Sequence, residues 1–231
     1  MKHKNSHLLV GYWSRIRRGR AVPDQTDIDP RALKRMLSQV FILDVENPQR
    51  PIYRLAGTSL CERFGFELKG TGFLSHWEAQ SSVALASLLR QALKLRQPVC
   101  LHSIGSNSDC GMVEIETVLA PVSFNGDEPT RFIGMIQILG DQAALGGKPI
   151  AFQRLAGSQL IREDDPLPSY DNLPPPPPPP NGLPSLRNHP RAPHLRLVVS
   201  QSRPATVHFA DQAALDIIKA LDAGLGRLEP A

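Results

Sequence analysis

Several features that mark particular classes of protein are scarce or absent in this sequence of 231 residues. Aromatic residues make up 6% of it, and the three cysteines, Cys61, Cys100 and Cys110, include no closely spaced pair. An odd number of cysteines without short spacing argues against a disulfide framework and a zinc ribbon, and is typical of a reducing compartment. We therefore expect a cytoplasmic protein without a structural metal. His3 and His7 are four residues apart, but they lie at a terminus.

Long apolar runs are also missing. No segment approaches the roughly 18 apolar residues that span a bilayer. The apolar stretch 8–10 is too short for a signal peptide, and Tyr12, Trp13 and four arginines follow it closely. The sequence therefore argues against a transmembrane protein and against a secreted one.

Basic charge is concentrated in one place. The net charge is +4, yet the first 20 residues hold six basic side chains and no acidic one. The other 211 residues have 20 basic against 22 acidic side chains, a balance of −2. A nucleic-acid-binding domain needs basic charge over a whole face of the fold. We therefore expect no nucleic-acid partner.

Proline divides the chain into two regions. Thirteen of the 22 prolines lie between Pro166 and Pro204, and seven of them are consecutive, Pro174–Pro180. Such a run favours polyproline II, because proline cannot donate a ladder hydrogen bond. We expect 166–204 to be a largely disordered, semi-rigid linker and 205–231 to contain a short helical segment.

Periodicity in the first 141 residues changes between helical and extended patterns. Apolar residues recur at helical spacing in 6–17 and 81–96, whereas several other segments are continuously apolar or alternate. The expected strands are 40–43, 52–55, 99–104, 112–121 and 131–140, with short helical turns between the second and third.

This order predicts an α+β domain in which a five-stranded antiparallel sheet has helices on one face. The last strand is apolar on both faces and should be central. The expected organisation is an N-terminal helical cap (1–37), the sheet domain (38–141), a connecting segment (142–165), the proline-rich linker and the C-terminal segment.

Several sequence pieces together resemble the PAS domain family, in particular its compact single-PAS group found mainly in alphaproteobacteria. The pieces are YW at 12–13, DIDP at 27–30, FILDVE at 41–46, YRLAGTSLCERFG at 53–65 and the overlapping CERFGFELKGTGF at 61–73. The resemblance covers about residues 10–140. It implies the PAS fold, in which a curved antiparallel sheet and helices enclose a core that can bind a ligand.

Enzymatic motifs are absent. There is no G-x-S-x-G elbow and no phosphate-binding loop, and no kinase, cyclase or helix-turn-helix segment follows the PAS-like region. We therefore expect a protein that is not an enzyme.

Two known PAS cofactors are disfavoured by local sequence. Haem would need a single axial ligand such as His76, but a packed histidine is more common. A flavin-reactive cysteine lies between Asn and a nearby Gln, whereas Leu60 precedes Cys61 and Gly65 and Phe66 follow. We expect no cofactor.

Ten apolar residues should line the space between helices and sheet. They either surround a ligand or fill a dry core, which a domain of this size also needs. These candidates are Phe64, Phe66, Phe73, Trp77, Leu85, Leu89, Val113, Ile115, Phe132 and Ile136.

The N-terminal helix carries an apolar stripe of Leu9, Trp13 and Ile16. In PAS proteins such a helix commonly packs on the sheet or pairs with its copy in a homodimer, and these residues are our dimer candidates. An alternative is a peripheral membrane contact, in which the arginines meet anionic lipid.

The sequence thus predicts a cytoplasmic sensory or regulatory PAS module that acts through a small ligand or a signalling protein, as a homodimer. The alternative is a ligand-free scaffold whose proline-rich tail recruits a partner. The sequence names neither signal nor partner.

Overall fold

The structure is a computed structural model that describes residues 1–47 and 49–162. The predicted linker 166–204 and C-terminal segment 205–231 lie outside the described residues. The longer helices are α1 (Lys4–Ile16), α2 (Thr58–Phe64) and α3 (Ala79–Leu95). The strands are β1 (Val40–Asp44), β2 (Ile52–Ala56), β3 (Val99–Ser106), β4 (Met112–Ser123), β5 (Pro129–Ile138) and β6 (Phe152–Leu160). Short 3₁₀ helices are η1 (Gln25–Asp27), η2 (Leu37–Gln39), η3 (Phe73–His76) and η4 (Gln142–Leu145).

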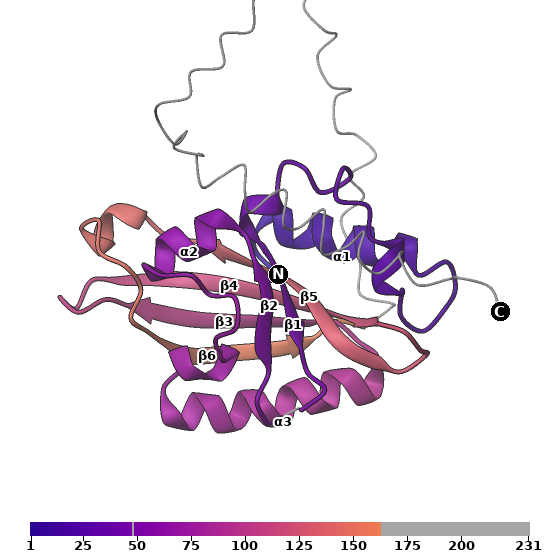
Figure 1. Ribbon diagram of the computed structural model, residues 1–231. Coiled ribbons are helices and arrows are strands. Elements are labelled where there is room, and N and C mark those ends of the chain that lie inside the picture. Colours follow the sequence, from indigo (N-terminus) through magenta and orange to yellow (C-terminus); the bar gives the residue numbers. More distant parts are fainter. Residues whose placement is uncertain (48, 163–231) are drawn as a thin grey trace, which may run out of the picture. The chain divides into compact units, whose positions relative to one another are not determined.

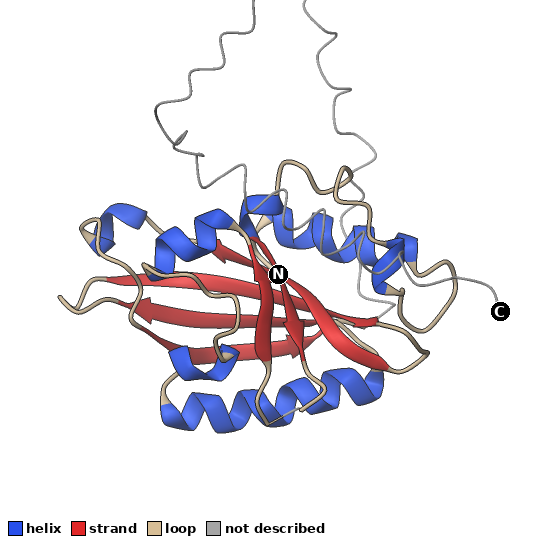
Figure 2. Cartoon of the chain, viewed as in Figure 1, coloured by secondary structure: helices blue, strands red, loops and turns tan. Residues whose placement is uncertain are grey.

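The strands form one antiparallel sheet in the order β2-β1-β5-β4-β3-β6 (Figures 1 and 2). The predicted fold is confirmed, including the central β5, which pairs with β1 on one side and β4 on the other. The continuous apolar character of β5 follows from this position, because a central strand is covered on both faces.

The sheet has a sixth strand where the sequence predicted only a connecting segment. β6 pairs with the whole of β3, from Val99 opposite Leu160 to Ser106 opposite Phe152. Most β6 side chains are at least partly exposed, and only Gln153 is buried. An edge strand with little apolar alternation gives a weak sequence signal, which explains why it was missed.

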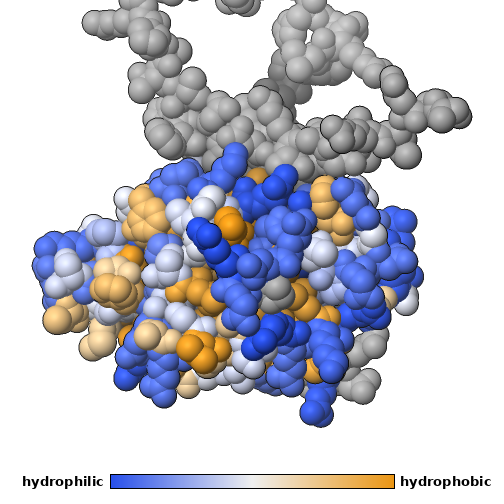
Figure 3. All heavy atoms as spheres, turned by 60° about the horizontal axis from the view of Figure 1, so that its bottom comes forward, coloured by the Kyte–Doolittle hydropathy of each residue, from blue (hydrophilic) through white to orange (hydrophobic). Residues whose placement is uncertain are grey.

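One face of the sheet is covered by α2, η3 and α3, and the space between forms the inner core. Alternate strand residues point into it, including Phe41 and Leu43 of β1 and Phe132 and Ile136 of β5. α3 contributes Leu85, Leu89 and Ala92 at helical spacing. The exposed side of the helix is polar over much of its length, and polar residues predominate on the face turned forward in Figure 3.

The opposite face of the sheet is covered by α1, which lies on the other side of the sheet from α3 (Figure 1). The intervening strand residues, Val40 and Ile42 of β1 and Ile133 and Met135 of β5, form an outer core with the helix. The alternation of strand side chains therefore builds two apolar layers that share one sheet.

The dimer assignment of Leu9, Trp13 and Ile16 is corrected by this arrangement. Leu9 and Trp13 are buried in the outer core and Ile16 packs against it, so the stripe is used within the chain. The Trp13 indole N–H also donates to the Pro121 carbonyl at 2.7 Å. The stripe caps the sheet, because β1, β4 and β5 present a second apolar face that needs cover.

A close approach inside the sheet depends on glycine. A Cβ atom at Gly134 of β5 would lie 2.3 Å from Cζ of Phe41. Phe41 is the residue of β1 that pairs with Gly134, and its ring lies over the glycine. A side chain at this position and the Phe41 ring therefore exclude each other.

Among the described helices, none combines the length and the apolar composition that crossing a bilayer requires.

Candidate ligand-binding core and metal-ligating cluster

The structure places nine of the ten predicted cavity residues together in the inner core. Phe66 is the exception, because its side chain lies after the end of α2 and is 42% exposed. Its assignment to the cavity is therefore wrong. Gly65 ends the helix in a left-handed conformation, which directs the following residue away from the core.

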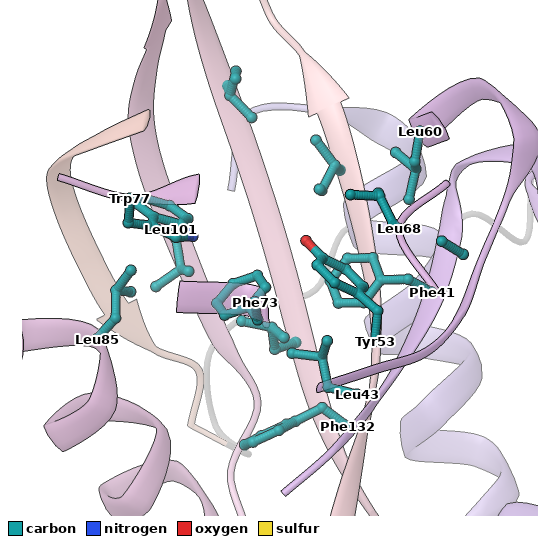
Figure 4. Close-up of a cluster of buried hydrophobic side chains, with 14 of the residues drawn as sticks. Phe41, Leu43, Tyr53, Leu60, Leu68, Phe73, Trp77, Leu85, Leu101 and Phe132 are labelled. Atoms are coloured by element: carbon teal, nitrogen blue, oxygen red, sulfur yellow. The ribbon is translucent and has the colours of Figure 1, made fainter. Parts of the chain in front are cut away.

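Aromatic rings fill much of the inner core (Figure 4). Phe41 lies edge-on to Tyr53 at 5.4 Å between ring centroids, and Phe73 lies 5.7 Å from Tyr53 and 5.8 Å from Trp77. Phe41 and Tyr53 were not among the predicted cavity residues. The continuously apolar run 40–43 and the alternation in 52–55 are the signals that could have found them.

Polar atoms are buried among these apolar side chains. The Tyr53 hydroxyl, the Trp77 indole N–H, the Thr117 hydroxyl and the Gln153 amide nitrogen have no hydrogen-bond partner among the described residues. Each of the four residues is at most 5% exposed. Thr117 follows the alternation of Ile115 and Leu119 and therefore faces the same core. Burying such groups unpaired costs about 1–3 kcal/mol each.

Burial raises the pKa of Tyr53 far above its ordinary value, with a smaller contribution from the Cys61 thiol. The phenol therefore stays protonated and can donate a hydrogen bond. Figure 4 shows its hydroxyl directed among apolar side chains of the core. A polar atom of a small molecule placed there would satisfy it.

A separate surface pocket of about 460 Å³ lies beside α2 and is lined by Ala56, Thr58, Cys61, Glu62, Gly65, Phe66 and Glu67. The Cys61 thiol donates to Glu67 Oε1 at 3.6 Å, and burial, followed by the Glu67 charge, raises its pKa. A protonated thiol in this position is not an activated nucleophile.

His76 packs against two aromatic rings at the edge of this region. Its ring lies 5.7 Å from Phe64 and 5.1 Å from Phe66, and burial lowers its pKa. His76 is thus used in packing.

A cluster of possible metal ligands lies on the other face of the sheet, next to the start of α1. Cys100 and His102 are two residues apart on β3, and Glu116 of β4 pairs directly with His102. The Cys100 Sγ to His102 Nε2 distance is 3.7 Å, and His102 Nε2 is 3.9 Å from Glu116 Oε2. One ligand atom from each residue lies within 4.8 Å of the others.

Glu116 is fully buried and its carboxylate accepts the backbone N–H groups of Lys2 and His3. Burial by itself raises the pKa of Glu116, but these hydrogen bonds and the nearby Ser6 hydroxyl outweigh it and lower the pKa. Burial, followed by the Glu116 charge, raises the pKa of Cys100 to about 12. The cluster therefore holds a carboxylate beside a thiol.

The sequence prediction missed this cluster because it considered ligand spacings typical of helices and zinc ribbons. On a strand, residues two apart share a face, and the third ligand comes from the neighbouring strand. Only the register of β3 against β4 brings Glu116 opposite His102. The Cys-x-His spacing in a predicted strand was the available signal.

Part of this chain is similar to several solved structures. Among curated proteins, no match was found. One of the solved structures is a light-oxygen-voltage domain from a study of a flavin analogue, with 12% sequence identity and a TM-score of 0.40; the match covers 49% of this chain and 86% of that one. Another is the Rhodobacter sphaeroides LOV protein, with 17% identity and a TM-score of 0.38; the match covers 50% of this chain and 70% of that one. The light state of Aureochrome1 LOV also matches, with 12% identity and a TM-score of 0.38; the match covers 49% of this chain and 91% of that one.

A sequence profile described as PAS domain matches residues 1–137. This match covers more than half of the chain, from α1 through almost all of β5. It thus includes the helix on the outer face as well as both faces of the sheet. The chain belongs to the PAS domain family.

Proposed function

We propose that this PAS protein is a non-enzymatic, cytoplasmic sensory or regulatory module that binds a small polar molecule in its inner core. One observation carries the proposal: Tyr53, Trp77, Thr117 and Gln153 bury polar atoms there without a partner in the described chain. Four unpaired groups in one core represent a cost that a ligand with matching donors and acceptors removes.

The outer helix supplies a route by which occupancy of the core is passed on. Phe132 faces the inner core and the next residue, Ile133, faces the outer core beneath α1. A ligand that shifts β4 or β5 therefore changes the surface on which Trp13 and Leu9 pack. We propose that this change alters the contact of α1 with a protein partner.

Isosteric variants test whether the buried polar atoms serve a ligand. Tyr53→Phe and Thr117→Val each remove one hydroxyl with little change in shape. The matched control is Tyr12→Phe, because the Tyr12 hydroxyl lies in the outer layer and already accepts the Asp29 N–H at 2.7 Å. Native mass spectrometry of freshly purified full-length protein measures any retained molecule, and urea unfolding measures stability.

We expect the wild type to retain a small molecule, the two inner variants to retain clearly less, and Tyr12→Phe to retain as much as the wild type. After the molecule has been removed, Tyr53→Phe should be more stable than the wild type by about 1–2 kcal/mol, since an unpaired hydroxyl is gone. The proposal fails if the wild type retains no molecule and the two inner variants are merely more stable than the wild type. That result would identify a dry core and a ligand-free scaffold.

A further inference from the structure

We propose that Cys100, His102 and Glu116 form a binding site for one divalent, thiophilic metal ion, for which Zn²⁺ is the best fit. The site lies on the outer face of the sheet, where β3 and β4 meet the start of α1. It is independent of the inner core and of the function proposed there.

The donor set matches the chemistry of Zn²⁺, which binds Cys sulfur, His nitrogen and carboxylate oxygen. With Zn–S of about 2.3 Å and Zn–N or Zn–O of about 2.0–2.1 Å, tetrahedral ligand atoms lie roughly 3.3–3.6 Å apart. The distances from His102 Nε2 are 3.7 Å to Cys100 Sγ and 3.9 Å to Glu116 Oε2. The three ligand atoms lie within 4.8 Å of one another, so metal binding draws them closer together.

The positions of the three ligands are set by the backbone of the sheet. Cys100 and His102 point to the same side of β3, and the antiparallel register places Glu116 opposite His102. The carboxylate is held further by the N–H groups of Lys2 and His3. Each carboxylate oxygen has two lone pairs, so ligation does not require these hydrogen bonds to break.

Access and the acidic groups fit a cation, which takes the place of the N-terminal ammonium that lies close to Cys100 and Glu116. Cys100 and Glu116 are fully buried, whereas the His102 side chain is 30% exposed and leaves an approach from solvent. Binding deprotonates the Cys100 thiol and releases that proton to solvent, so one thiolate and one carboxylate neutralise the divalent ion. A water molecule supplies the fourth ligand, as in zinc sites with three protein ligands.

The two ring nitrogens of His102 have different surroundings. Its Nδ1 atom is buried and has no hydrogen-bond partner among the described residues, although Nε2 faces the other two ligands. A metal on Nε2 fixes the proton on Nδ1 and thereby one tautomer. The cluster thus offers a soft donor, an imidazole nitrogen and a buried anion at one point.

Cobalt titration of the full-length, chelator-treated protein tests the site directly. Co²⁺ occupies zinc sites, and a Cys ligand gives it a sulfur-to-metal charge-transfer absorption. The variants are Cys100→Ser, which removes the thiolate, and His102→Gln, at the most exposed ligand. Cys61→Ser and His76→Gln are matched controls, because they change the same residue types outside the cluster. Circular dichroism verifies that each variant is folded.

We expect one Co²⁺ per chain with the charge-transfer band, displaced by Zn²⁺. Cys100→Ser should lose the band, His102→Gln should bind at least about tenfold more weakly, and both controls should resemble the wild type. Zn²⁺ should also slow alkylation of Cys100 in the wild type but not in His102→Gln, a readout that remains if Cys100→Ser fails to fold.

Absence of the sulfur band in the wild type would overturn the proposal, as would equal cobalt affinity of wild type and His102→Gln. A sulfur band that persists in Cys100→Ser would assign the metal to another cysteine of the chain, and would equally refute this site.

Discussion

Trp13 provides the sharpest test of how α1 is used. Its side chain is 5% exposed, packs in the outer core between helix and sheet, and donates to the Pro121 carbonyl at 2.7 Å. If this packing stabilises the domain, Trp13→Ala must lower the free energy of unfolding. If the side chain instead served a dimer contact, the same variant would change association and leave the fold stable.

The size of the effect follows from these contacts. Removing a buried indole by truncation to alanine costs about 3–5 kcal/mol. Trp13→Phe keeps an aromatic ring but leaves the buried Pro121 carbonyl without its donor, which costs about 1–3 kcal/mol. For a protein of this size each kcal/mol corresponds to about 2–4 °C in Tm. Trp13→Ala should therefore lower the Tm by roughly 6–20 °C, and Trp13→Phe by roughly 2–12 °C.

Urea unfolding followed by circular dichroism measures the change, and sedimentation velocity is recorded on the same samples. Arg15→Ala is the matched control, since Arg15 lies on the exposed side of α1 and its removal should change stability by no more than about 0.5 kcal/mol. Unfolding of Trp13→Ala at the wild-type urea concentration, combined with a shift to a lighter species, would refute the packing role and restore the dimer contact.

Three further predictions test the fold. Truncation after Asp165 should leave a cooperative unfolding transition in thermal melts. Truncation after Asp141 removes β6 from the edge of β3, and should lower the Tm or abolish the transition. Gly134→Ala forces the Phe41 ring aside and should cost about 1–3 kcal/mol in urea unfolding, and an unchanged midpoint would contradict the close approach. Burial lowers the pKa of His76 from 6.5, so the folded state binds a proton less readily than the unfolded one, and stability should be complete above that pH and decline as the pH falls below it. His76→Gln should remove this part of the decline, and an identical pH profile for the two proteins would rule it out.

The inner core could be predicted because its signals are local. Apolar residues at helical spacing in α3 and alternating residues at the start of β4 each indicate one face, the continuously apolar β5 indicates a central strand, and nine of the ten proposed cavity residues share the core. Phe66 was misplaced because hydrophobicity does not show that Gly65 turns the chain outward. The surface that Leu9 and Trp13 contact could not be predicted from the local pattern either, because an apolar stripe on a helix does not specify what covers it.

The metal-ligating cluster depends on information that no single segment contains. Cys100 and His102 define one side of a strand, but Glu116 lies 14 residues beyond His102 and becomes a neighbour only through strand pairing. In antiparallel strands a shift of one residue would turn Glu116 to the inner face and bring Thr117 to the outer one. Register is fixed by burial of the whole sheet and therefore could not be derived from the three residues themselves.

The same alternation makes the two proposed sites separable by experiment. Glu116 and Thr117 are adjacent in β4, yet they face opposite sides of the sheet. The Glu116 carboxylate lies beside Cys100 and His102 on the outer face, whereas the Thr117 side chain faces the inner core. Thr117→Val should therefore weaken retention of a co-purifying molecule without changing the cobalt-thiolate absorption. His102→Gln should weaken cobalt binding and leave that retention unchanged. Loss of both properties in either variant would show that the two faces of β4 are not independent, and would contradict the assignment of these sites to opposite sides of the sheet.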